Sequence, residues 1–249
     1  MAPSRAARPG GGQVPEDECP FDAGREDRTP PETLRLGDPW RVRVFPNLYP
    51  AFERQEVVVH SPEHLTSLAE LDDEQLVLVA DAWRRRREAV PGGYLHALVN
   101  EGREAGASRE HTHSQLVWLD TPPDETQHLV DRKRWTVVAE RDGLVLACPY
   151  ASRLPYELVI TPAEPRSGAF TDELLPASLT LLGDAVRRLR RAYDGPVPFN
   201  AWLHDSADWH VEVLPRKNVL AGVELGAGIY VNSVPPEEAA AVLGGLGAH

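Results

Sequence analysis

Residues 94–119 of the chain read YLHALVNEGREAGASREHTHSQLVWL. The runs at 94–100 and 111–119 have the apolar content and length of strands, and a loop containing glycines separates them. A similar order of elements recurs about one hundred residues later, which indicates a tandem duplication. We therefore predict an α+β fold of two fused halves, each an antiparallel sheet with a covering helix.

Two local matches support the duplication. The segment Glu56-Val-Val-Val-His-Ser-Pro62 lines up with Glu157-Leu-Val-Ile-Thr-Pro162, and His111-Thr-His113 falls opposite His210-Val-Glu212. The other predicted elements are strands at 34–45, 56–60, 143–147, 156–161, 200–204 and 209–214, and helices at 72–90 and 171–193. The predicted organisation is a mobile arm at 1–18, a first half at 19–128 with the catalytic motif, and a second half at 129–249.

The strand at 111–119 carries an unusual set of polar side chains. Because side chains of a strand alternate between faces, His111, His113 and Gln115 are expected on the same face. An isolated His-x-His is most often an ordinary hydrogen-bonded or solvated sheet face. Here a loop at 100–108 precedes it, with glycines that allow tight turns and backbone N–H groups able to face an anion.

This combination predicts phosphate chemistry with His113 as the nucleophile. A neutral imidazole is nucleophilic near neutral pH, and its attack on an α-phosphorus gives a covalent phosphoramidate. The second ring nitrogen must then donate a hydrogen bond to a carbonyl or carboxylate. Gln115 can donate its amide N–H to a phosphate oxygen without competing as a base.

Composition narrows the class of protein. The formal net charge of -12 argues against a nucleic-acid-binding face, although it permits a small phosphorylated ligand. No window is apolar enough to predict a membrane span, and the N-terminal residues lack the apolar core of a secretory signal. Two cysteines cannot form a disulfide framework, so we expect a cytoplasmic protein.

Several motifs in order resemble one known family. They are Arg5-Ala-Ala-Arg8-Pro9, Cys19-Pro-Phe21, Val44-Phe45-x-Asn47, Ser61-Pro62-x-His64, Asn100-x5-Gly106-x-Ser108-x2-His111-x-His113-x-Gln115, Trp209-His210-Val-Glu212, and Gly222-x-Glu224-x-Gly226-x-Gly228 before Asn232. Over most of its length the chain resembles galactose-1-phosphate uridylyltransferases and their relatives in the histidine-triad superfamily, including ADP-glucose phosphorylase-like proteins. The resemblance implies two fused histidine-triad-like halves.

The resemblance also implies an activity and roles for residues. His113 would take a nucleoside monophosphate from a nucleoside-diphosphate sugar, and a phosphate or sugar 1-phosphate would accept it. Gln115 and Ser108, beside Gly106, would hold phosphate oxygens. Asn47 and Asn100 would lie near the nucleoside and phosphates, and Arg5 and Arg8 would reach phosphates from the arm. The family further implies a homodimer with a shared active site.

Members of the family often hold a structural zinc ion through two cysteines and two histidines. The corresponding set here is Cys19, Asp22, His64 and His111, with Asp22 in the place of the second cysteine. A carboxylate is an acceptable zinc ligand, so tetrahedral coordination by these four side chains is the expected cofactor site. The alternative is an unliganded buried cysteine and a surface aspartate. A second metal at His204, His210 and Glu212 is not expected, and Cys148 is expected in the core.

Two departures from the uridylyltransferase pattern leave the substrate open. Thr112 and Ser114 stand where that pattern has Pro and Gly, and residues 222–232 are closer to the phosphorylase-like relatives. We also expect no strand before the arginine arm, where the family usually has one. The alternatives are a hydrolase or phosphorylase of dinucleoside polyphosphates, and a degenerate nucleotide-binding protein. The intact His113 and Gln115 pair disfavours the last.

Overall fold

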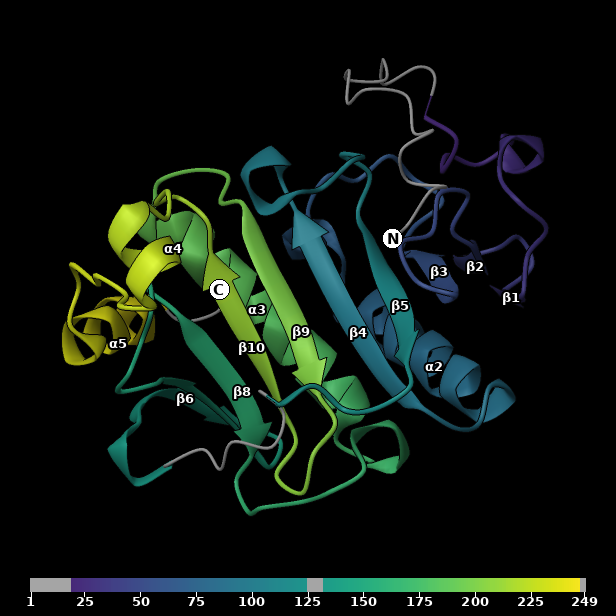
Figure 1. Cartoon of the computed structure of the whole chain (residues 1–249). Helices are drawn as coiled ribbons and strands as arrows, with labels where there is room; N and C mark the ends of the chain where they lie inside the picture. The colour runs from purple at the N-terminus through teal and green to yellow at the C-terminus, as the bar shows by residue number, and fades with distance from the viewer. Residues whose placement is uncertain (1–18, 125–131, 247–249) are drawn as a thin grey trace.

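A computed structural model describes residues 19–124 and 132–246. Residues 1–18, which include Arg5 and Arg8, lie outside the described part of the chain. The described strands form one ten-stranded sheet in the order β1-β2-β3-β5-β4-β9-β10-β8-β7-β6, and all neighbouring strands in it are antiparallel. Figure 1 shows this sheet facing the viewer, with α2 and α3 behind it. The predicted α+β class is confirmed.

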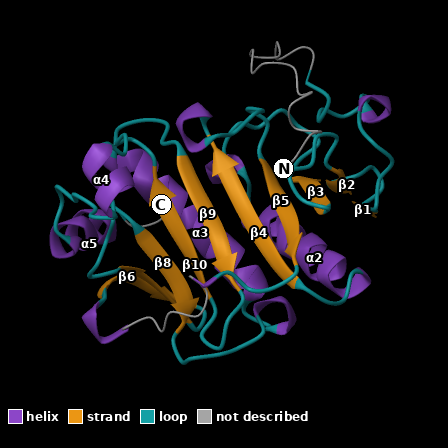
Figure 2. Cartoon of the chain, viewed as in Figure 1, coloured by secondary structure: helices purple, strands orange, loops and turns teal. Residues whose placement is uncertain are grey.

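The elements have the following bounds. The strands are β1 (Leu34–Leu36), β2 (Val42–Pro46), β3 (Arg54–Val59), β4 (Tyr94–Glu101), β5 (His113–Leu119), β6 (Thr136–Arg141), β7 (Leu144–Cys148), β8 (Leu158–Pro162), β9 (Phe199–His204) and β10 (His210–Pro215). The α-helices are α2 (Asp73–Ala89), α3 (Leu175–Ala192), α4 (Gly222–Ala227) and α5 (Pro236–Gly245). In Figure 2, α2 and α3 lie behind the strands, and α4 and α5 lie beside the sheet at the left. No helix in the described residues is long and apolar enough to cross a bilayer.

Helix α2 forms as the sequence predicts. The side chain of Asp72 caps its N-terminus by accepting a hydrogen bond from the backbone N–H of Gln75 at 2.7 Å. Its apolar side chains recur at helical spacing, and Leu76, Val79 and Trp83 are buried against the sheet. The helix ends at Ala89 with Val90 as its C-cap, directly before Pro91. Helix α2 therefore covers the back of the strands that carry the candidate site.

Two sequence predictions about strands are wrong. The predicted strand at 34–45 is a hairpin of β1 and β2, because Gly37 turns the chain with a φ of +86°. The predicted strand at 111–119 begins only at His113. His111 lies before the strand, and the expected alternation of faces does not extend to it. Strand β6 and helices α4 and α5 were not foreseen.

The two halves of the sheet meet where β4 pairs with β9, with Leu98 opposite Trp202. Each half has strands, a helix and two further strands, in agreement with the predicted order. The division at 128–129 falls among residues outside the described ranges and remains a prediction.

The sequence alignment that places His111 opposite His210 must be shifted by two residues. His113 Nδ1 donates to the carbonyl of His111, and His210 Nδ1 donates to the carbonyl of Asp208. His210 is therefore the counterpart of His113 rather than of His111.

Candidate active site

The polar side chains of interest lie on the face of the sheet away from the helices, which we call the open face. Residues directly opposite each other on antiparallel strands share a face. Gln115 of β5 lies opposite Leu98 of β4, and His113 shares its face two residues earlier. Ser114 lies between them and points to the helices, where its Oγ accepts a hydrogen bond from Trp83 Nε1 at 2.9 Å. Helix α2 thus fixes β5 from behind.

His113 is almost fully buried, with 5% of its surface exposed. Its Nδ1 lies 2.8 Å from the carbonyl oxygen of His111. Since a carbonyl only accepts, Nδ1 carries the proton, and the neutral ring keeps its lone pair on Nε2. The ring of Phe21 meets the imidazole edge-on, with centroids 5.4 Å apart. The predicted donor bond from the ring to a carbonyl is therefore present at Nδ1.

Gln115 is half-buried on the same face as His113. Its Oε1 accepts a hydrogen bond from Gln55 Nε2 at 2.6 Å. The side-chain oxygen of Gln115 is therefore already hydrogen-bonded within the protein. The amide nitrogen of Gln115 is the atom that can donate hydrogen bonds to a ligand. A phosphate oxygen beside His113 needs such a donor.

The loop between β4 and β5 differs from expectation in one respect. The backbone N–H groups of Ala105, Gly106 and Ala107 donate to carbonyls of Gly102 and Arg103 within the loop. These three amides do not face an anion, because they hold the loop in shape. Gly102 needs its small size, since a Cβ there would lie 2.7 Å from Pro198.

Ser108 and Gly106 are exposed in this loop. Asn100 is the last but one residue of β4, and its Oδ1 accepts a hydrogen bond from Asn200 Nδ2 at 2.7 Å, across the junction of the two halves. Asn47 follows β2, and its Oδ1 accepts from the backbone N–H of Tyr49 at 2.9 Å. In both predicted binding residues, Asn47 and Asn100, these hydrogen bonds use the side-chain oxygen and not the amide nitrogen.

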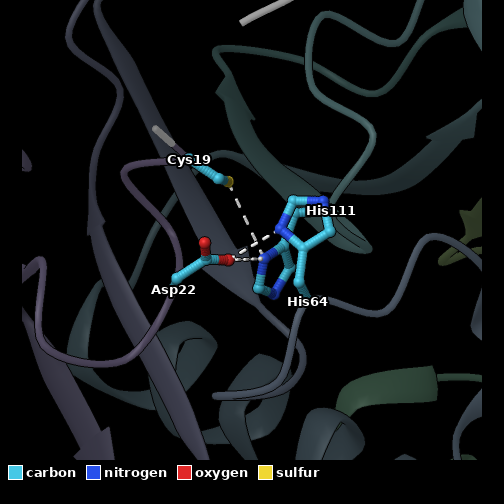
Figure 3. Close-up of side chains that lie close together, drawn as sticks. All are labelled: Cys19, Asp22, His64 and His111. Atoms are coloured by element: carbon cyan, nitrogen blue, oxygen red, sulfur yellow. Dashed lines mark hydrogen bonds and ion pairs between the residues drawn. The ribbon is translucent and has the colours of Figure 1, made fainter. Parts of the chain in front are cut away.

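The four predicted zinc ligands do come together, as Figure 3 shows. Asp22 Oδ1 lies 2.7 Å from His64 Nδ1 and 3.1 Å from His111 Nδ1. Cys19 Sγ lies 3.8 Å from His111 Nδ1. All four ligand atoms lie within 4.8 Å of one another.

The chemistry of this set fits a metal. His111 is fully buried, and its Nε2 lies 2.9 Å from the carbonyl of Ser61, so Nε2 carries the proton of the neutral ring. Its Nδ1 lone pair then faces a carboxylate and a sulfur, both of which are also electron-pair donors. Burial lowers the pKa of His111, which favours this neutral form. A zinc ion held by the four side chains would link the 19–22 segment to His111, which lies two residues before His113. Such an ion would have a structural role.

The second cluster, His204, His210 and Glu212, also comes together. His210 and Glu212 line a pocket with Trp135 and Arg153. Protein donors already engage two of the cluster's side chains, Glu212 and His204. The guanidinium of Arg153 bonds to Glu212 and also to Glu157, at 2.6 Å from Glu157 Oε1.

His204 is occupied too, because Trp202 Nε1 donates to its Nε2 at 2.6 Å. A divalent ion would therefore have to displace a fixed positive charge and an indole N–H group. These contacts compete with a metal ion for Glu212 and His204.

Sequence reasoning missed three contributors to the site. Phe21 was noted only as part of a motif, although its ring contacts both His111 and His113. Gln55 and Arg153 were not singled out, because their partners are distant in sequence. No local signal distinguishes Gln55, because its neighbours Arg54 and Glu56 in β3 are polar as well.

Comparison with known proteins identifies relatives of the whole chain. The family model for the N-terminal domain of galactose-1-phosphate uridyl transferase matches residues 48–123. An ADP-glucose phosphorylase from Arabidopsis thaliana is 26% identical, over 98% of this chain and 88% of the relative. A galactose-1-phosphate uridylyltransferase from Thermotoga maritima is 22% identical, over 92% of this chain and 89% of the relative.

A solved structure agrees with these matches. The crystal structure of an ADP-glucose phosphorylase from Arabidopsis thaliana with bound ADP-glucose superposes with a TM-score of 0.87 and 25% identity, and the match covers 100% of this chain and 95% of the other.

Proposed function

Because the chain belongs to the galactose-1-phosphate uridylyltransferase-like family of the histidine-triad superfamily, we propose that it transfers a nucleoside monophosphate through a covalent bond to His113. The donor is a nucleoside-diphosphate sugar, and the acceptor is a phosphate or a sugar 1-phosphate. The observation that carries this proposal is the buried imidazole with Nδ1 held by the His111 carbonyl. That bond leaves Nε2 directed away from the backbone as a nucleophile.

The reaction has two displacements at the same phosphorus. In the first, Nε2 of His113 attacks the α-phosphorus, the bond to the bridging oxygen breaks, and sugar 1-phosphate leaves. In the second, an oxygen of the acceptor attacks the α-phosphorus, and Nε2 leaves with its electron pair. The His111 carbonyl stabilises the positive charge that the ring carries while phosphorylated.

The other predicted site residues have supporting roles in this proposal. Gln115 donates its amide nitrogen to an α-phosphate oxygen, and Ser108 beside Gly106 holds a further phosphate oxygen. Asn47 and Asn100 contact the nucleoside and phosphates. Arg5 and Arg8, which belong to the arm, are proposed to contact phosphates of the substrate.

Two pairs of substrates are favoured by the relatives. One is ADP-glucose with inorganic phosphate, which would give ADP and glucose 1-phosphate. The other is UDP-glucose with galactose 1-phosphate, which would give UDP-galactose and glucose 1-phosphate. We favour the first, because an ADP-glucose phosphorylase matches 98% of this chain and its crystal structure superposes over the full length. We place the reaction in the cytoplasm, since both cysteines are unpaired thiols.

The experiment that tests the activity compares acceptors for each donor. ADP-glucose and UDP-glucose are incubated separately with phosphate, galactose 1-phosphate or water, and products are quantified by ³¹P NMR. Consumption of ADP-glucose that requires phosphate supports the proposal. Consumption that proceeds equally in water, or cleavage only of a dinucleoside polyphosphate, supports the hydrolase alternative instead.

We further propose a homodimer. The segment 219–231 exposes several apolar side chains, with 91% of Val219, 73% of Leu225 and 61% of Ile229 accessible. Monomers rarely leave such a run uncovered, so a second copy is the proposed partner. Sedimentation velocity is expected to give a dimer, and Leu225→Asp to shift it toward monomer. A monomer at all concentrations for the unchanged protein contradicts this proposal.

The zinc site gives a prediction about Asp22. We expect the protein from zinc-supplemented medium to carry about one zinc ion per chain. Asp22→Ala is expected to lose the ion and to lower the melting temperature, whereas Asp22→Cys retains it, because a thiolate is also a zinc ligand. Elemental analysis and calorimetry measure both effects. A metal-free unchanged protein with full thermal stability would show that Asp22 only hydrogen-bonds the two histidines.

A further inference from the structure

The side chain of Gln55 lies between two parts of the proposed active site. Its Oε1 accepts a hydrogen bond from the backbone N–H of Ala51 at 2.8 Å, and its Nε2 donates to Gln115 Oε1 at 2.6 Å. Its backbone carbonyl accepts from the N–H of Asn47 at 2.8 Å. Gln55 therefore connects the loop that carries Asn47 to Gln115, the proposed phosphate-binding side chain.

These bonds determine which end of each carboxamide points where. A backbone N–H can only donate, so the atom of Gln55 that faces Ala51 is the oxygen. Its nitrogen must then face Gln115, and the atom of Gln115 that meets it must be the oxygen. The ambiguity of an isolated carboxamide is thus removed by one backbone N–H group. The Nε2 of Gln115 is left to point away from Gln55.

This orientation matters because the oxygens of a phosphate diester only accept hydrogen bonds. The terminal torsion of glutamine is broad, so an untethered carboxamide presents oxygen to the substrate as readily as nitrogen. An oxygen there would repel the phosphate. We infer that Gln55 is a positioning residue that holds the amide nitrogen of Gln115 toward the α-phosphate. The effect of Gln55 on catalysis rests on the proposed function, whereas the orientation of the Gln115 carboxamide does not.

The variant Gln55→Glu tests the inference by reversing the orientation. The introduced carboxylate still accepts from Ala51, but its second oxygen accepts from Gln115 Nε2 and turns the Gln115 oxygen toward the substrate. We expect kcat to fall about tenfold to a hundredfold, the range for losing one donor to a developing charge. Gln55→Met, which leaves the Gln115 amide untethered, is expected to lose less. A kcat within twofold of the unchanged protein overturns the inference.

Two controls separate orientation from the added charge. In a Gln115→Ala background the orientation effect disappears, so Gln55→Glu is expected to lower kcat no further. A purely electrostatic effect of the carboxylate would persist there. As pH is lowered, the introduced carboxyl group takes up a proton and can donate to Gln115 again. The activity of Gln55→Glu relative to the unchanged protein is therefore expected to rise as pH falls.

The orientation can also be measured without any substrate. The chain has only five glutamines, so selective ¹⁵N-glutamine labelling gives few side-chain signals. The inference expects the Gln55 amide protons to show a hydrogen-bonded shift and slow exchange, and Gln115 to take over that shift in Gln55→Glu. If these signals behave as expected but no donor is turned over, the proposed function fails and the orientation holds. If donors are turned over and the signals do not change, the inference on Gln55 is wrong.

Discussion

Replacing His113 by alanine is expected to lower the rate of nucleotidyl transfer by at least about a thousandfold. In the proposed mechanism the imidazole forms a bond to phosphorus, and no other side chain on the open face of β5 can replace it. Gln115 is not a nucleophile, and the ring of His111 points to Cys19 and Asp22 with its second nitrogen on Ser61. The measurement is steady-state turnover of ADP-glucose and phosphate, with the fold checked by circular dichroism.

The second half supplies a matched control for this variant. His210 occupies the counterpart position and makes the same type of Nδ1 bond, to the carbonyl of Asp208. Its neighbour two residues on is Glu212 rather than a glutamine, and an anion there would repel a phosphate. His210→Ala is therefore expected to keep turnover within a few-fold. Equal losses in both variants would show that the effect is structural rather than chemical.

The largest effect on stability is expected for Trp83→Ala. Trp83 is 2% exposed in α2, and its indole lies against the back of β5, where Nε1 donates to Ser114 Oγ. Truncating such a side chain leaves a cavity and an unpaired hydroxyl, which together lower the free energy of unfolding by about 3–5 kcal/mol. Urea unfolding measures the loss. Because domains of this kind are stable by only about 5–15 kcal/mol, the variant is best studied at low temperature.

Trp83→Phe is the control that separates the contribution of the hydrogen bond to Ser114 from that of apolar packing. Phenylalanine keeps much of the apolar volume and removes the N–H group, so its loss reports mainly on the hydrogen bond to Ser114. We expect that loss to be about 1–2 kcal/mol. A loss below about 1 kcal/mol for Trp83→Ala would contradict the role of α2 as the support of the catalytic strand.

The sequence was sufficient where a regular period extends over a whole element. The helix at 72–90 was predicted nearly to its ends because a capping aspartate precedes it and Pro91 follows it. The strands of the first half were recognisable from their apolar runs. The strand at 34–45 was predicted without its turn, because the apolar residues on both sides of Gly37 continue the same pattern.

Side-chain geometry was predictable only in part. The gathering of Cys19, Asp22, His64 and His111 was expected from the resemblance to a family, and the structure brings them together. Strand alternation failed at His111, because Thr112 bonds to the backbone of Leu65 and the regular strand starts after it.

The partners of Gln55 and Arg153 depend on long-range pairing. Gln55 meets Gln115 through the register of β3 on β5, and Arg153 meets Glu212 through a loop and β10. Periodicity carries no information about such contacts.

The central claim is the covalent bond between His113 and a nucleotide, and intact mass spectrometry tests it most directly. The protein is incubated separately with ADP-glucose, UDP-glucose, UDP-galactose and a GDP-sugar, and spectra are taken without acid, because phosphoramidates are acid-labile. We predict a gain of one nucleoside monophosphate with at least one donor, which also identifies the base, and no gain in His113→Ala. Turnover of a donor with no adduct, or an adduct that persists in His113→Ala, would contradict the account.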